Sequence, residues 1–183
     1  MDGPFWVDLR APHMAADAAS VTLLTTSTAI LPTANFPVLG SNYFGFVGKM
    51  VRMRVWGQMT AAATPGNLTV QLYWGTNANA NGTVIVASAA TALTAGTALS
   101  WELDLTCRCR AIGATGSLIG HGMFNSNVSL VASTLQPVMM PASAAVPVTV
   151  DLTQNYVLSP QMIASGTAGS TMIVHEFTFE ALN

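Results

Sequence analysis

The sequence predicts an all-β protein, an antiparallel two-sheet sandwich of the jelly-roll-like kind. Short runs rich in Val, Leu, Thr and Trp alternate apolar and polar residues, as strands with one buried face do. Turn signals separate these runs about every 8–12 residues, the spacing typical of sandwiches. No stretch of about 11 residues has the apolar spacing of an amphipathic helix.

The predicted strands follow one another along most of the chain. They cover residues 21–24, 27–31, 48–60, 68–74, 83–87, 101–111, 117–124, 128–133, 146–152, 155–158 and 170–180. Pro65 and Gly66 form a turn, because proline fixes φ and glycine permits a positive φ. The aromatic, glycine-punctuated segment 35–48 is predicted to be loop and sheet edge.

The strand at 48–60 carries two contrasting faces. One face holds Val51, Met53, Val55, Gly57 and Met59, which we expect to point into the core. The other face holds Arg52, Arg54, Trp56 and Gln58. This second face raises the question of what it contacts, because arginine and tryptophan together are typical of protein interfaces.

Two later strands show the same alternation. In 101–111 the inward set is Trp101, Leu103, Leu105, Cys107, Cys109 and Ala111, and the outward set is Glu102, Asp104, Thr106, Arg108 and Arg110. In 170–180, Ile173, His175, Phe177 and Phe179 are predicted to lie opposite Met172, Val174, Glu176, Thr178 and Glu180. The two cysteines are expected to be buried free thiols, since residues two apart in a strand are spaced at about the upper limit for a disulfide.

The composition narrows the function classes. Charged residues make up only 8% of the chain, against about 25% in a typical domain. With a net charge of −2 and one lysine, a nucleic-acid partner is not expected. No apolar run approaches the roughly 20 residues of a membrane span, and the first residues do not resemble a secretory signal. A surface this poor in charge favours a protein that packs against others; the alternative is a monomer with a Thr/Ser-rich surface.

The chain divides into an N-terminal arm and one domain. Residues 1–20 show little periodicity and are predicted to be an extended arm, and residues 21–183 form the sandwich. Phe5 and Trp6 are costly to leave in water, so we expect the arm to dock. Its partner is either another protein or the arm's own domain.

The outward charges suggest how the strands meet. Opposite charges on neighbouring strands pair across a sheet, and each pair contributes about 0.2–1 kcal/mol. We expect Arg52, Arg54 and Trp56, with Tyr73 a strand away, to form an interface with another copy of the chain. The alternative is a solvated sheet face on which arginine stacks on tryptophan.

The residues argue against an enzyme. Residues 116–120, GSLIG, do not have the spacing of a nucleophile elbow, and the glycine-rich segment 113–122 lacks the lysine of a phosphate loop. His13, His121 and His175 are far apart in the sequence. We therefore expect no catalytic residue, no metal and no cofactor.

Several motifs, in order, resemble those of a known group of proteins. They are Gly-Lys at 48–49, AATPGNLT at 62–69, WGT at 74–76, WELDLTCR at 101–108, IGATG at 112–116 and EALN at 180–183. The group consists of minor structural proteins of tailed bacteriophages, and the resemblance covers residues 20–183. It implies a jelly-roll-like virion component, commonly a trimer.

The resemblance suggests a capsid decoration protein on the outer surface of the shell. Its partners would be copies of itself and the major capsid protein, with the arm as a natural anchor. A minor tail or fibre-associated protein is the alternative. A carbohydrate-binding module is a further alternative, for which Tyr43, Phe44, Tyr73 and Trp74 are the candidate aromatic residues.

Overall fold

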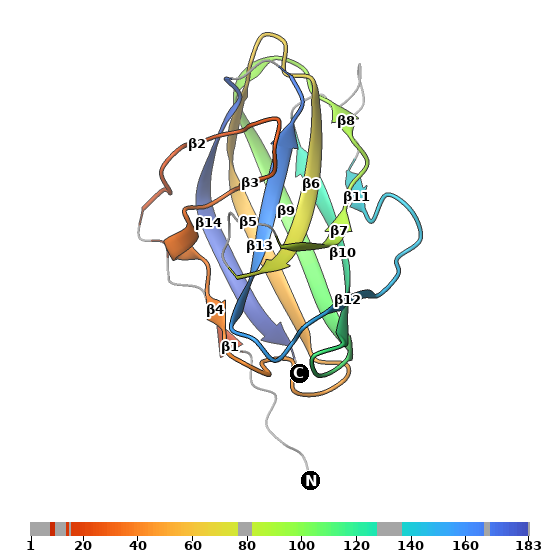
Figure 1. The fold of residues 1–183 in the computed structure, drawn as a ribbon. Helices are drawn as coiled ribbons and strands as arrows, with labels where there is room; N and C mark the ends of the chain where they lie inside the picture. Colours follow the sequence, from red (N-terminus) through yellow and green to blue (C-terminus); the bar gives the residue numbers. More distant parts are fainter. Residues whose placement is uncertain are drawn as a thin grey trace.

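Two antiparallel β-sheets pack face to face, which confirms the predicted all-β sandwich (Figure 1). The structure is a computed structural model that describes residues 8–9, 14, 16–76, 82–127, 137–166 and 169–182. Within this part of the chain the single helical element is a 3₁₀ turn, Thr33–Asn35. None of the described helical residues could form a membrane-spanning helix.

Sheet A contains the long strands. Its order is β1 (Asp8–Leu9), β14 (Thr171–Leu182), β5 (Met50–Ala61), β9 (Gly96–Ala111), β10 (Gly116–Ser126) and β11 (Val138–Met140). Two short strands complete it: β12 (Val148–Val150) pairs with β10, and β2 (Val21–Thr22) pairs with β14.

Sheet B is smaller. Its order is β3 (Thr28–Ala29), β13 (Tyr156–Ala164), β6 (Asn67–Gly75) and β7 (Thr83–Ala87). In addition, β4 (Val38–Leu39) pairs with β13, and β8 (Thr91–Ala92) pairs with β6. The chain crosses from sheet A to sheet B between β5 and β6, and it returns before β9.

The core lies between the sheets and is built from the inward residues that the alternation predicts. Val51, Met53, Val55 and Met59 of β5 are fully buried, and so are Leu103, Leu105, Cys107 and Cys109 of β9. Both cysteines are free thiols, as expected. Their burial raises the pKa of both thiols above the ordinary value.

The predicted alternation of the last strand is wrong in its first half. A register shift between Val174 and Glu176 inserts one residue opposite β5. A bulge of this kind changes which face the following residues occupy. Met172 and Val174 are therefore buried before the bulge, and Phe177 and Phe179 are buried after it. Ile173 and His175, which were predicted to lie on the same face as the phenylalanines, are only half-buried.

The strand predicted at 155–158 is longer in the structure, where β13 runs through Pro160 to Ala164. Proline is tolerated where no neighbouring strand needs its missing N–H. Here β4 pairs with residues 156 and 157, and β3 pairs with residues 161 and 162. Pro160 lies in the gap between these two short partners.

The described residues of the N-terminal segment lie along the outer edge of β14. Asp8 and Leu9 pair with Ala181 and Glu180, and the amide of Ala18 donates to the carbonyl of Val174 at 2.8 Å. This part of the arm therefore folds back on its own domain. Phe5, Trp6 and the strand predicted at 128–133 lie outside the described residues.

Candidate interaction surface

The outward side chains of sheet A form an ordered grid, which we call the charged face. The strand register places them in three cross-strand rows. These are Glu180–Arg52–Thr106–His121, Thr178–Arg54–Asp104–Met123 and Glu176–Trp56–Glu102–Asn125. Each row runs across β14, β5, β9 and β10, so residues distant in sequence become direct neighbours.

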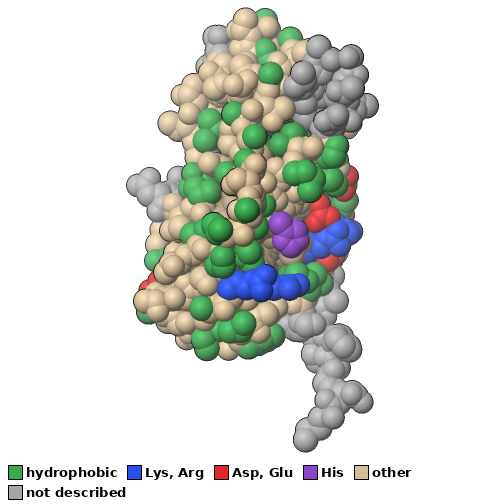
Figure 2. All heavy atoms as spheres, turned by 90° about the vertical axis from the view of Figure 1, so that its right-hand side faces the viewer, with side chains coloured by type: hydrophobic (Ala, Val, Ile, Leu, Met, Phe, Trp, Pro, Cys, Tyr) green, Lys and Arg blue, Asp and Glu red, His purple; other side chains and the backbone are tan. Residues whose placement is uncertain are grey.

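Charge is concentrated on this one sheet. Eight of the fourteen charged residues lie on β5, β9 and β14, whereas the described strands of sheet B carry none. In Figure 2, blue, red and purple side chains gather in the lower half of the molecule, and the upper half shows uncharged side chains. The few charged residues are therefore distributed unevenly: they lie mostly on sheet A, and the described strands of sheet B have none.

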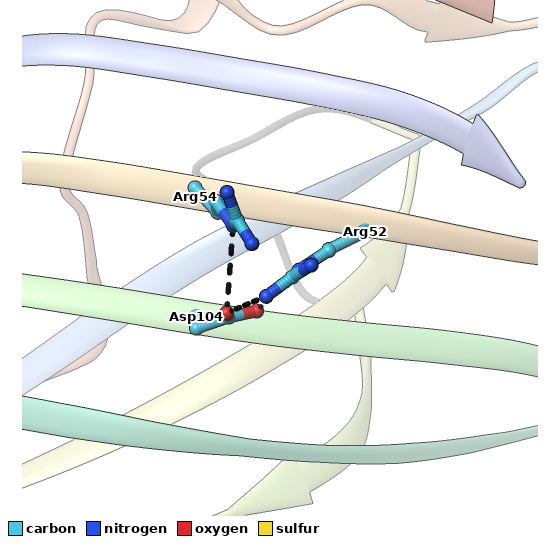
Figure 3. A network of polar contacts seen from close by, with 3 residues as sticks. All are labelled: Arg52, Arg54 and Asp104. Carbon is cyan, nitrogen blue, oxygen red and sulfur yellow. Dashed lines mark hydrogen bonds and ion pairs between the residues drawn. The ribbon is translucent and has the colours of Figure 1, made fainter. Parts of the chain in front are cut away.

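One carboxylate at the centre of the charged face holds two arginines (Figure 3). Arg52 donates from Nε to Asp104 Oδ1 at 3.0 Å and from Nη2 to Oδ2. Arg54 Nε lies 3.5 Å from the same Oδ2. The hydrogen bonds that Arg52 donates to the Asp104 carboxylate raise the pKa of Arg52. The predicted pairing of opposite charges across neighbouring strands is thus confirmed.

This pair sets geometry more than it stabilises the fold. The side chains of Arg52 and Asp104 are 31% and 25% exposed. Partly exposed pairs of this type contribute about 0.2–1 kcal/mol, because water screens them. However, the two-point contact from Arg52 holds both guanidinium and carboxylate in place, which fixes the shape of the surface around Trp56.

The charged face has two electrically different ends. Glu102 and Glu176 flank Trp56 in one row. Within the described residues, the side chain of neither glutamate makes a hydrogen bond or an ion pair. Arg108 lies six residues further along β9, so the strand rise puts it roughly 20 Å from Glu102. One end of the face is therefore acidic and the other basic.

The face is hollowed on its β10 side. A hollow of about 390 Å³ borders Trp56, Glu102 and Asn125. A second, of about 310 Å³, is lined by Arg52, Asp104, His121, Met123 and others. Trp56 itself is half-buried. A partner surface could insert side chains into these hollows and cover the indole ring.

The structure brings three of the predicted interface residues together and separates a fourth. Arg52, Arg54 and Trp56 are neighbours on β5. Tyr73 lies on β6 in sheet B, where its hydroxyl donates to Gln71 Oε1 at 3.1 Å. The prediction that Tyr73 lies a strand away from the arginines is wrong, because the chain changes sheets between β5 and β6.

Sequence reasoning also missed the contribution of β10 to this surface. His121, Met123 and Asn125 face outward beside Thr106, Asp104 and Glu102. The available signal was the glycine-bounded turn at 112–116. Because such a turn joins β9 to β10 as a hairpin, the two strands had to be adjacent.

The aromatic residues considered for sugar binding do not form an exposed platform. Trp74 and Phe44 are 2% and 1% exposed, with ring centroids 5.8 Å apart in the core. Tyr43 packs edge-on against Phe44, and the ammonium of Lys49 lies 4.0 Å from the centroid of the Tyr43 ring. The carbohydrate hypothesis therefore loses Phe44 and Trp74 as stacking residues, because both are buried in the core.

The remaining titratable groups are scattered. His121 lies on the charged face, whereas His175 Nδ1 lies 2.8 Å from Asp17 Oδ1 on the N-terminal segment. Among the residues that the structure describes, no group of three or more His, Cys, Asp or Glu side chains is placed to hold a metal ion.

Comparisons with known proteins add little to this picture. No known family and no curated protein matches the sequence. A functionally unknown protein from Saccharomyces cerevisiae is similar in structure, with 12% identity and a TM-score of 0.38, over 94% of this chain and 92% of that one. An alginate lyase from Alteromonas sp. 272 has 6% identity and a TM-score of 0.27, over 97% and 95% of the two chains. At these TM-scores neither similarity carries an argument about function.

Proposed function

We propose that this protein is a non-enzymatic structural component of a bacteriophage virion, a capsid decoration protein that self-associates on the outer surface of the shell. The charged face is the observation that supports this proposal most strongly. It combines arginines, a half-buried tryptophan and adjacent hollows on one sheet, which are features of protein interfaces. The resemblance of the sequence motifs to those of phage structural proteins suggests the biological setting.

A second copy of the chain is the partner that the charge pattern favours. The acidic end of the face, with Glu102 and Glu176, and the basic end, with Arg108, have opposite signs. When two such faces pack with their strands antiparallel, each acidic end lies over the basic end of the other copy. Like charges then avoid one another, so the surface complements itself.

Trp56 would supply most of the binding energy. Tryptophan is the residue most enriched among interface positions that dominate affinity, especially when neighbouring groups exclude water. Here the Arg54–Asp104 pair and Glu102 surround the indole. Burying the exposed part of this ring is favourable, whereas the surrounding charges chiefly set orientation.

Replacement of Trp56 tests the interface. We expect Trp56→Ala to shift the purified protein to monomer in sedimentation and to leave its β-sheet circular dichroism unchanged. Tyr73→Ala is the matched control, because Tyr73 is also a half-buried outward aromatic residue but belongs to sheet B. If Trp56→Ala remains oligomeric, the charged face does not join the copies.

Mixing with undecorated capsids tests the location. An oligomer of this protein that loads onto capsids supports decoration and contact with the major capsid protein. A species that ignores capsids and joins tails would place the protein in the tail, the alternative favoured by the same resemblance. Deletion of residues 1–7, which leaves β1 and β2 in place, tests the anchoring role predicted for Phe5 and Trp6.

A further inference from the structure

One end of the sandwich presents three exposed apolar side chains, which we call the apolar end. Phe46 and Val47 lie in the loop before β5, and Ile112 lies in the turn between β9 and β10. Their exposed fractions are 49%, 60% and 53%. Large apolar side chains gathered on adjacent loops are typical of a surface that another molecule covers.

The two loops are neighbours. The amide of Gly48 donates to the carbonyl of Cys109 at 2.9 Å, and the amide of Cys109 donates to the carbonyl of Lys49 at 2.8 Å. Ile112 follows Cys109 by three residues. The backbone ladder therefore brings the tip of one loop beside the turn that carries Ile112.

The loop tip is also held in shape. The amide of Lys49 donates to the carbonyl of Phe46 at 3.3 Å, and Gly48 has φ +97°. A turn closed in this way with a positive φ at its third residue is a type II turn, in which glycine is favoured. Phe46 and Val47 are thus presented on a preformed turn, which reduces the entropy that binding has to overcome.

Basic side chains border the apolar end. Lys49 closes the turn, and the exposed Arg110 precedes Ile112 by two residues. In the described segments 40–49 and 110–116 no acidic residue occurs. The nearby Asp151 keeps its negative charge, and its carboxylate is held in place by hydrogen bonds that it accepts from Thr153 and Gln154. Figure 2 shows green side chains below a blue stripe at this lower end.

We propose that the apolar end is the surface that docks onto the shell, against a patch of the capsid protein that has an apolar centre and acidic edges. An apolar core with a polar rim is the usual organisation of a protein interface. Carboxylates on the partner would meet the exposed Arg110, whose guanidinium can bind a carboxylate in two-point fashion. This inference rests on the proposed decoration role, because it assigns that role a contact surface.

The geometry allows both contacts at once. The apolar end lies at the tip of the sandwich, where the loop before β5 and the β9–β10 turn meet (Figure 1). Trp56 lies further along β5, six residues after Met50. One copy can therefore use its charged face for self-association and its apolar end for the shell, while in an antiparallel pair the apolar end of the second copy points away from the shell.

The test measures binding to purified capsids that lack this protein. The test variant changes Phe46, Val47 and Ile112 to Ser. The control variant changes Leu24, Val38 and Val146 to Ser, because these side chains are 48%, 63% and 66% exposed but lie elsewhere. We expect the test variant to bind at least tenfold more weakly than wild type, and the control variant to bind as wild type does.

A second variant tests the basic edge of the apolar end separately from the apolar substitutions. Arg110→Glu should weaken capsid binding several-fold, and wild-type binding should weaken from about 0.05 to about 0.5 M NaCl, as screened ion pairs do. Circular dichroism and thermal unfolding of every variant should match wild type, since all the changed residues are exposed or half-exposed.

The outcomes separate the inference from the proposed function. If wild type binds capsids and both the test variant and Arg110→Glu bind equally well, the apolar end is not the docking surface and decoration stands. If wild type binds no capsid, the decoration role and this inference both fail. The same variants are also mixed with vesicles that contain about 30% phosphatidylserine. If wild type and the control variant bind these vesicles and the test variant does not, the apolar end contacts a membrane surface and the proposed protein partner is wrong.

Discussion

Gly57, at the centre of the charged sheet, has no room for a side chain. A Cβ built there would lie 2.8 and 2.9 Å from two ring carbons of Trp101, and it would overlap the carbonyl oxygen of Ile173. Gly57 pairs with Val174, directly beside the bulge in β14. Gly57→Ala must therefore displace either a buried indole or the backbone of the neighbouring strand.

The cost follows from these contacts. Overpacking a filled core costs about 1–3 kcal/mol. Moving the Ile173 carbonyl disturbs the adjacent ladder, where each hydrogen bond contributes about 1 kcal/mol. Alanine also lowers the conformational entropy of the unfolded chain, and this offsets about 0.4–1 kcal/mol of the loss in stability. We expect a net loss of about 2–3 kcal/mol, or a fall in Tm of about 4–12 °C for a chain of this length.

Urea unfolding, monitored by circular dichroism, should show this loss as a lower midpoint urea concentration with an unchanged m-value. Gly40→Ala is the control, because a Cβ at Gly40 has no atom within 4 Å and should change the stability by no more than about 1 kcal/mol. A Gly57→Ala protein within about 0.5 kcal/mol of wild type would refute the packing argument. Repeating the change in a Trp101→Phe background separates the ring from the carbonyl as the main obstacle.

Two further predictions concern titratable groups. Cys107 and Cys109 should not react with a thiol reagent at pH 8 until the protein unfolds, because both are buried and burial raises the pKa of both thiols; rapid reaction of the native protein would contradict their placement. The hydrogen bonds from Thr153 and Gln154 lower the pKa of Asp151, so the unfolded carboxyl, with its ordinary pKa near about 4, takes up a proton first as the pH falls. The stabilisation by Asp151 should be complete above about pH 5 and lost progressively below it. The difference in free energy of unfolding between wild type and Asp151→Asn should therefore shrink as the pH falls. A difference that stays constant with pH would exclude the proposed role of these hydrogen bonds.

Much of the fold could be predicted because most strands have one buried face. In β5, and over residues 101–109 of β9, every second residue is apolar and buried, whereas Ala111, which was predicted to face inward, is only half-buried at the end of the strand. The composition of the charged face was also predictable, since Arg52, Arg54 and Asp104 stand at outward positions of their strands. Alternation reports burial residue by residue, and it therefore identifies faces reliably.

Sheet membership and register could not be predicted in the same way. Tyr73 and Asp104 occupy equivalent outward positions, yet one lies on sheet B and the other beside Arg52. The difference depends on where the chain crosses between sheets, which local pattern does not record. The bulge at His175 is a one-residue insertion in an otherwise regular run, so nothing in the alternation marks it before its partner strand is known.

The position of β14 has a consequence for how the protein is made. This strand contains residues 171–182, yet it lies between β5 and the short strands β1 and β2 near the N-terminus. Sheet A therefore cannot close during synthesis until residue 182 has left the ribosome. Until then the edge of β5 and the apolar faces of the finished strands remain uncovered, and exposed edges and apolar faces are where growing chains associate with one another.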